Sequence, residues 1–168
     1  DLRAALVQVR DAGMNMLRIS GSFAYEREEF FALCDELGIL VWQDFMFANM
    51  DYPADDAAFM ESVRVEAEQQ LTLWDRHPCI AVICGNSEVS QQSAMWGAPR
   101  ELWNPALFGT VLAALAGQRC PNAVYWPSSA WGGSFPHQVD CGTTSYYGVG
   151  AYLRGADDLR RSGLRFAT

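Results

Sequence analysis

The stretch EREEFFALCDELGILVWQDF, residues 26–45, passes directly from a helical pattern to a strand pattern. Phe30, Leu33 and Leu37 recur at helical spacing, and Gly38 follows them as a stop signal for a helix. The closing ILVWQDF is a near-continuous apolar run, which is typical of a strand covered on both faces. A helix followed at once by a buried strand predicts a parallel α/β sheet.

The same alternation continues on both sides of this stretch. Helices are predicted at 1–12, 26–38, from the Asp55–Asp56 cap to Trp74, and at about 101–117; strands are predicted at 14–20, 39–45, 79–85 and 123–129, with weaker signals at 143–148 and 164–168. No low-complexity segment or linker interrupts the pattern. We therefore expect an α/β fold with right-handed crossovers and a single domain over residues 1–168.

Composition limits the partners of the chain. Of its 168 residues, 12 are basic and 20 are acidic, which gives a net charge of −8. This balance argues against nucleic acid and against an anionic membrane surface, because both attract basic patches. The five cysteines show no CxxC spacing and mostly lie in apolar runs. We expect buried free thiols rather than disulfides or a zinc site, and hence a cytoplasmic location of the bacterial type.

Polar side chains recur where the predicted strands end, which is where parallel α/β folds carry their functional residues. The candidates are Arg18 and Ser20, Gln43 and Asp44, Asn86 and Glu88, and Tyr146 and Tyr147. A plainer interpretation stays open for some of them. Arg18 and Asp44 would also fit a structural ion pair, and the nearby tryptophans would also fit ordinary packing.

Three segments carry a resemblance to a known family: GMNMLRIS (13–20), EFFALCDELGILVWQDFMFANMDYP (29–53) and RHPCIAVICGNSE (76–88). Together they resemble the catalytic barrel of glycoside hydrolase family 2, in particular its β-mannosidase branch. The likeness is dense over about residues 12–92 and looser beyond. It implies a (β/α)8 TIM barrel, here incomplete with about strands 2 to 7, and retaining hydrolysis of terminal β-linked sugars without metal or organic cofactor.

The resemblance also implies roles for single residues. It implies that Glu88 is the general acid/base and that Arg18 holds the carboxylate of the nucleophile in its ionised form. By the same resemblance, Asp44 and Asn86 bind sugar hydroxyls, and Tyr146 reaches the nucleophile. The expected ligand is therefore a carbohydrate.

The second carboxylate of the mechanism is expected outside the chain. A retaining glycosidase uses two carboxyl groups roughly 5 Å apart. In the family the nucleophile follows an Arg-Phe-x-Ser/Thr run, and this chain ends on such a run at Arg165–Thr168. We therefore expect a piece of a longer protein, inactive alone, with the nucleophile just beyond Thr168. The unclosed barrel would leave open sheet edges, which favour a homo-oligomer.

Three serines depart from the family pattern and keep two alternatives open. Ser87 stands where the family usually has Asn, while Ser20 and Ser145 stand where the β-mannosidase pattern has Trp and His. One alternative is a β-galactosidase or β-glucuronidase of the same family. The other is a non-catalytic, carbohydrate-binding degenerate barrel.

Overall fold

The fold is a parallel sheet with helices packed on one side. A computed structural model describes residues 1–49 and 51–167 of the chain. Its main elements are α1 (Leu2–Asp11), β1 (Met16–Ile19), α2 (Glu28–Leu37), β2 (Leu40–Asp44), α3 (Ala57–Trp74), β3 (Ile80–Cys84), α4 (Val89–Met95), α5 (Leu112–Arg119), β4 (Val124–Trp126) and α6 (Asp157–Arg161). The four strands are all parallel and pair in the order β1-β2-β3-β4, which confirms the predicted parallel α/β class.

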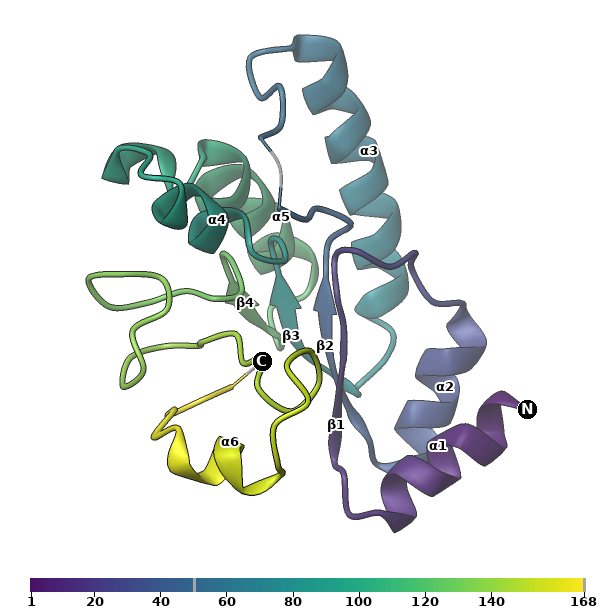
Figure 1. Cartoon of the computed structure of the whole chain (residues 1–168). Coiled ribbons are helices and arrows are strands. Elements are labelled where there is room, and N and C mark those ends of the chain that lie inside the picture. The colour runs from purple at the N-terminus through teal and green to yellow at the C-terminus, as the bar shows by residue number, and fades with distance from the viewer. Residues whose placement is uncertain (50, 168) are drawn as a thin grey trace.

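The predicted helices α2 and α3 form where their end signals lie. Gly38 follows α2 in the left-handed conformation, at φ 70°, and its amide donates to the carbonyl of Cys34. The Asp56 side chain caps α3 by accepting from the amides of Ala58 and Phe59. Figure 1 shows α2, α3 and α5 on one side of the sheet and the segment that carries α6 on the other.

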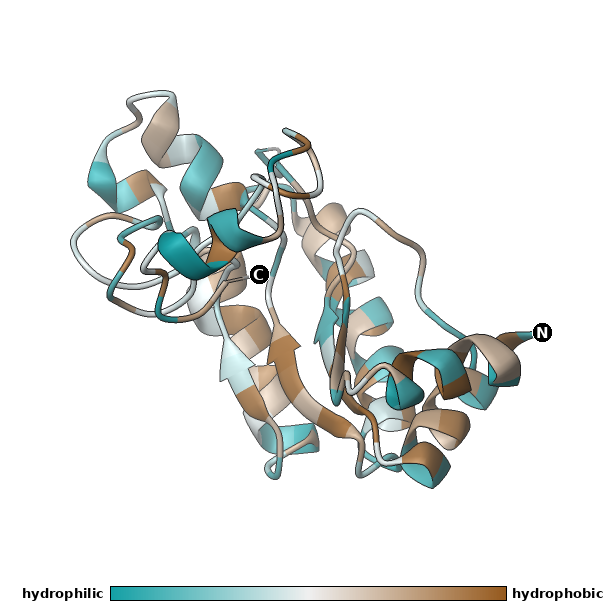
Figure 2. Ribbon diagram, turned by 60° about the horizontal axis from the view of Figure 1, so that its bottom comes forward, coloured by the Kyte–Doolittle hydropathy of each residue, from teal (hydrophilic) through white to brown (hydrophobic). Residues whose placement is uncertain are grey.

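A hydrophobic core fills the space between the sheet and its helices. It contains the fully buried side chains of Phe31, Val41, Leu71, Trp74 and Ile83. Figure 2 shows the hydrophobic residues gathered on the strands and on the helix faces that meet them.

Most of the cysteines are also buried. All five are free thiols and four of them are buried, as the sequence predicts, and burial raises the pKa of Cys34 to about 11.

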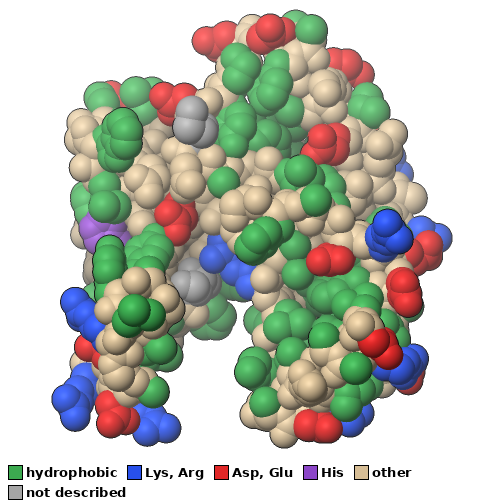
Figure 3. Space-filling model, turned by 45° about the vertical axis from the view of Figure 1, so that its right-hand side comes forward, with side chains coloured by type: hydrophobic (Ala, Val, Ile, Leu, Met, Phe, Trp, Pro, Cys, Tyr) green, Lys and Arg blue, Asp and Glu red, His purple; other side chains and the backbone are tan. Residues whose placement is uncertain are grey.

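The other face of the sheet is built in two layers of side chains. Register places Arg18 beside Trp42, Trp42 beside Val82, and Val82 beside Val124. One step toward the carboxyl ends, Asp44 lies beside Cys84 and Cys84 beside Trp126. The Phe166 ring lies 5.8 Å from that of Trp42, so the end of the described chain returns over this face. Figure 3 shows the molecule hollowed between the lobe that carries α6 and the lobe of α1 and β1.

The later part of the chain differs from the sequence prediction. The helix expected at about 101–117 is broken into a 3-10 turn (Arg100–Leu102), a π-helical turn (Leu107–Val111) and α5. Pro105 accounts for the break, because proline lacks the amide that a continuous helix would use. The short helices α4 and α6 were not predicted.

The expected strands at 143–148 and 164–168 are reduced to isolated bridges. Thr143 bridges to Trp131 and Thr144 to Ala167, while Thr168 lies outside the described residues. The described residues thus contain four of the six strands that the barrel prediction implies. The incomplete (β/α)8 barrel and the single-domain boundary remain predictions.

Candidate active site

The carboxyl ends of β1, β2 and β3 bring the predicted polar residues together. Because the three strands are parallel neighbours, their ends open on the same edge of the sheet. Two isolated bridges, Ala48 with Ser87 and Ser87 with Ser129, extend the pairing just beyond the strands. Arg18, Asp44 and the segment Asn86–Glu88 therefore share one site.

Asp44 is buried and accepts hydrogen bonds from three neighbouring residues. Its side chain is 0% exposed, and the guanidinium of Arg18 contacts both of its oxygens, at 3.4 Å (Nε–Oδ1) and 2.7 Å (Nη2–Oδ2). The Trp42 indole donates to Oδ1 at 2.8 Å, and the Gly21 amide donates to Oδ2 at 3.0 Å. Burial opposes the charge of Arg18, but the adjacent carboxylate of Asp44 raises the pKa of Arg18 above its usual value. The ion pair that the sequence left open is thus present.

The serines that depart from the family pattern form a hydroxyl cluster beside this ion pair. Arg18 Nη2 donates to the Ser87 hydroxyl at 3.2 Å, and the Ser20 hydroxyl donates to the same oxygen at 3.2 Å. Ser20 also lies 3.0 Å from the hydroxyl of Ser22. Ser145, the third departure, lies in the later loop and takes no part in this cluster.

Asn86 holds the segment after β4 against the end of β3. Its amide nitrogen donates to the Pro127 carbonyl at 3.1 Å, and its Oδ1 accepts from the Ser128 hydroxyl at 2.7 Å and from the Val89 amide at 3.0 Å. The side chain is fully buried. Both ends of the amide therefore already have protein partners.

Glu88 follows in a left-handed backbone conformation at the start of α4. Its φ is +69°, a left-handed value that is uncommon for residues other than glycine, and it occupies the N-cap position of α4. Its amide donates to the Ser129 carbonyl at 2.6 Å. The half-buried carboxylate accepts at Oε1 from the Tyr147 hydroxyl at 2.5 Å and at Oε2 from the Gln92 amide at 3.2 Å. Both donors are neutral side chains.

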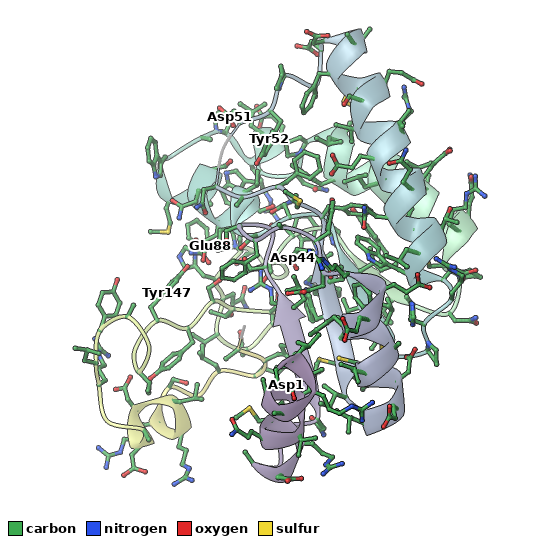
Figure 4. All side chains as sticks on the ribbon, turned by 90° about the vertical axis from the view of Figure 1, so that its right-hand side faces the viewer. Asp1, Asp44, Asp51, Tyr52, Glu88 and Tyr147 are labelled. Carbon is green, nitrogen blue, oxygen red and sulfur yellow. The ribbon has the colours of Figure 1, made fainter. Side chains whose placement is uncertain are left out.

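Tyr147, rather than Tyr146, is the tyrosine that reaches Glu88. The Tyr146 hydroxyl donates to Asp158 at 2.7 Å, so its predicted role at the nucleophile stays a prediction. Burial and the hydrogen bond to Glu88 raise the pKa of Tyr147 above its usual value, and Gln91 donates to the same hydroxyl at 2.8 Å. Figure 4 shows Glu88 between Asp51 on one side and Tyr147 on the other. The two adjacent tyrosines look alike in the sequence, and only the course of the loop separates them.

The site has no counterpart of a metal centre. Across residues 1–49 and 51–167, no group of three or more His, Cys, Asp or Glu side chains could hold a metal ion. Within the same residues no helix is both long and apolar enough to cross a membrane.

Two tryptophans lie on the face of the sheet opposite the helices and serve as packing and hydrogen-bonding groups. The Trp42 indole donates to Asp44, and the Trp126 indole donates to the Thr143 hydroxyl at 3.1 Å.

Comparisons with known proteins place this arrangement among glycosidases. No protein-family model matches the chain. A β-mannosidase from Capra hircus is 52% identical over 87 residues, which cover 52% of this chain and 10% of that protein. β-Mannosidase B from Thermothelomyces thermophilus is 34% identical over 155 residues, covering 84% of this chain and 18% of that protein. The chain thus spans between a tenth and a fifth of the length of these relatives.

A solved structure agrees with the sequence relatives. The crystal structure of β-D-mannosidase from Dictyoglomus thermophilum superimposes with a TM-score of 0.89 at 35% identity, over 100% of this chain and 21% of that one. The parallel sheet with polar residues at its strand ends is thus similar, in sequence and in fold, to proteins of the glycosidase class. In sequence and fold the chain is, more particularly, β-mannosidase-like within glycoside hydrolase family 2, which confirms the resemblance of its motifs.

Proposed function

We propose that the protein to which this chain belongs is a retaining β-glycosidase of the β-mannosidase type, which hydrolyses terminal β-linked sugars by double displacement. The observation that carries the proposal is the position of Glu88 just after the end of β3. The chain around it is similar to a β-mannosidase over 84% of the chain's length. The Glu88 carboxylate is half-buried, which leaves it open to a substrate. A carbohydrate is the partner that this chemistry requires.

In this proposal Glu88 acts first as an acid and then as a base. It protonates the glycosidic oxygen as the sugar is transferred to the nucleophile, and it then takes a proton from the water that releases the sugar. Tyr147 holds Oε1 through a short hydrogen bond, whereas Gln92 holds Oε2 at 3.2 Å. The more weakly bound Oε2 is the oxygen that we assign to proton transfer.

The residues around Glu88 take positioning roles. Arg18 and Asp44 neutralise each other beneath the site, and Asn86 fixes the turn that carries Glu88. The sugar-hydroxyl contacts predicted for Asp44 and Asn86 compete with the protein hydrogen bonds that these side chains already make. Asp44 is also unsuited to act as the second carboxylate, because it is fully buried and paired with Arg18.

The nucleophile is proposed to follow Thr168, outside the described residues. Phe166 supports this placement, because its carbonyl accepts from the Thr144 amide at 2.9 Å in the same region where Phe166 packs on Trp42. The end of the described chain therefore lies against the face of the sheet opposite the helices. A glutamate directly after Thr168 in the full-length protein favours the enzyme, and a residue without a carboxyl group favours a carbohydrate-binding barrel.

Kinetics of Glu88→Ala in the full-length protein test the proposal. A β-mannoside with a poor leaving group should be cleaved roughly 10²- to 10⁴-fold more slowly, because its oxygen needs a proton. A dinitrophenyl β-mannoside should keep its glycosylation step, since its leaving group departs without help. Azide should then restore turnover and give a β-mannosyl azide. Glu61→Ala, an exposed change on α3, is the matched control and should leave both rates unchanged.

Three outcomes contradict parts of this proposal. An α-azide product would identify Glu88 as the nucleophile. Equal loss on both substrates without azide rescue would make Glu88 a structural residue. If the wild-type protein cleaves β-galactosides or β-glucuronides in preference to β-mannosides, the proposed reaction stands but the proposed substrate is wrong.

A further inference from the structure

A pocket apart from Glu88 lies between the turns that follow α4 and the loop that follows β4. It has a volume of about 260 Å³, just below the roughly 300–1,000 Å³ of small-molecule sites. Figure 1 shows the loop after β4 leaving the sheet on the side where α4 lies. Its walls include neither Glu88 nor the side chains that bond to Glu88. They include Arg100, Trp103, Asn104 and Trp131, beside Gly132 and Gly133.

This pocket presents a positive charge in a chain whose net charge is −8. Arg100 supplies the charge, and among the described residues no acidic side chain lines the pocket. The guanidinium carbon lies 5.9 Å from the centre of the Trp103 ring, in a cation–π arrangement. In the part of the chain that the structure describes, the guanidinium makes neither a hydrogen bond nor an ion pair. Its N–H groups are therefore available to an anion.

Trp103 is a fixed platform for this guanidinium. Its indole donates to the Ala98 carbonyl at 2.9 Å, and its own carbonyl accepts from the Ser90 hydroxyl at 2.6 Å. The Phe135 ring meets it edge to face at 5.3 Å. Because the ring is held on several sides, a guanidinium that rests on it keeps a defined orientation.

Two further groups in the walls lack a partner. Asn104 Oδ1 is buried and accepts no hydrogen bond within residues 1–49 and 51–167. A Cβ at Gly109 would collide with the amide nitrogen of Asn104, so the glycine leaves room for this side chain. The backbone of Trp131 is bonded to that of Thr143, but its indole donates to no atom of the described residues.

These unpartnered groups together specify one kind of ligand. A guanidinium fork matches a carboxylate through two parallel hydrogen bonds. A buried amide oxygen needs a donor such as a hydroxyl, and an indole plane packs on the C–H face of a sugar ring. A neutral sugar would leave Arg100 unused, and a simple carboxylate would leave Asn104 and Trp131 unused.

We propose that this pocket binds a hexuronic acid, a pyranose that carries a carboxylate, at a site separate from the catalytic one. Arg100 binds the carboxylate, Asn104 accepts a hydrogen bond from a hydroxyl, and Trp131 packs on the ring. The site would hold an acidic polysaccharide by one of its uronate units. The inference does not rest on the proposed function, because Glu88 has no part in it.

The first test measures uronide binding to the full-length protein by calorimetry. The probes are methyl α-glucuronide and methyl α-galacturonide, whose α-linkage protects them from a β-glycosidase. At least one should bind, and Arg100→Gln should lower its affinity by roughly 10- to 100-fold, as expected for a charged hydrogen-bonded pair. Arg100→Lys should restore only part of the affinity, because an ammonium group lacks the planar fork. Arg27→Gln, at an exposed arginine before α2, is the matched control and should change nothing.

The second test separates the contributions of the ring and the carboxylate. Methyl α-glucoside and acetate should each bind at least roughly tenfold more weakly than the uronide. Trp131→Ala should weaken the uronide by roughly tenfold and leave acetate unchanged. Glu88→Gln should keep the uronide affinity within about twofold of the wild type, because Glu88 does not line the pocket.

Four results would overturn the site. They are no binding of either uronide, equal affinities for a uronide and the glucoside, an Arg100→Gln variant that binds as the wild type does, and a tenfold change in uronide affinity in Glu88→Gln. The last result would place the uronide in the catalytic site. Loss of hydrolysis in the full-length protein with Arg100-dependent uronide binding intact would refute the hydrolase and retain this site.

Discussion

Asp44 and Glu88 are two carboxylates near the ends of neighbouring strands, and they differ in burial and in their hydrogen-bond partners. Asp44 is fully buried, paired with a guanidinium and bonded to an indole and a backbone amide. Glu88 is half-buried, carries no ion pair among the described residues and accepts from two neutral side chains. Carboxylates near the ends of neighbouring strands therefore need not share the same chemistry.

The difference indicates which carboxylate has a structural role and which is free to react. A carboxylate held by several donors and a partly buried cation stays fixed, because moving it would leave those donors without partners. A carboxylate held by one hydroxyl and one amide has fewer partners to lose when it contacts a substrate. The predictions below are ordered by the size of the effect that this contrast implies.

The largest effect is expected from Asp44→Asn. The change leaves Arg18 without its counter-charge and turns an amide group toward three donors, so the free energy of unfolding should fall by about 3–5 kcal/mol. Urea unfolding measures the change. Asp55→Asn, on the exposed segment before α3, is the control and should stay within about 0.5 kcal/mol of the wild type. A loss below about 1 kcal/mol for Asp44→Asn would contradict the structural role assigned to Asp44.

A smaller effect is expected from Gly21→Ala, which disturbs the Asp44 side through the backbone. An added Cβ would lie against the carbonyl oxygens of Phe45 and Phe47, closer than real Cβ atoms approach. The shift that relieves this contact also moves the amide that donates to Asp44, so we expect a loss of about 1–3 kcal/mol in urea unfolding.

Gly117→Ala provides the matched control for that substitution. Gly117 lies within α5, and a Cβ there would meet no atom within 4 Å. Alanine should therefore stabilise the protein by about 0.5–1 kcal/mol, because it favours the helix. Loss of stability in both variants would mean that the crowding at Gly21 is not the cause.

The smallest effect concerns the proton of Tyr147. Its pKa is raised by burial and by the carboxylate of Glu88, which disfavours a second negative charge nearby. Glu88→Gln removes that charge, so the pKa of Tyr147 should fall while burial keeps it above its usual value of about 10. Ultraviolet titration of the phenol, with Tyr147→Phe to isolate its signal, measures the shift.

The same raised pKa predicts a dependence of stability on alkaline pH. Because the folded state favours the protonated phenol, its stabilising contribution is complete below about pH 10 and is lost as pH rises through the folded pKa. Tyr147→Phe should therefore lose less stability above that pH than the wild type. An unchanged Tyr147 titration in Glu88→Gln would show that the carboxylate has no influence on this hydroxyl.

The first half of the fold could be predicted from the sequence because its signals are strong and local. Gly38 and Asp56 mark helix ends by backbone conformation and by side-chain capping, and the apolar runs of β2 and β3 are nearly unbroken. After β3 the signals weaken. The seven residues of α4 are too few for a period to emerge, and Pro105 divides what looks like one helix.

The candidate site divides in the same way. The meeting of Arg18, Asp44 and Glu88 follows from the parallel order of their strands, so the sequence predicts it. The contacts of Tyr147 and Gln92 with Glu88 depend on the path of a loop and on a short helix. Neither leaves a periodic trace in the sequence.

The strand order β1-β2-β3-β4 also has a consequence for the synthesis of the protein. Each strand pairs with the one translated just before it, so the sheet can grow as the chain leaves the ribosome, without waiting for distant segments. All three donors to the Asp44 carboxylate, Arg18, Gly21 and Trp42, precede it in the chain. The hydrogen bonds of the Asp44 carboxylate can therefore form before Glu88 has been translated.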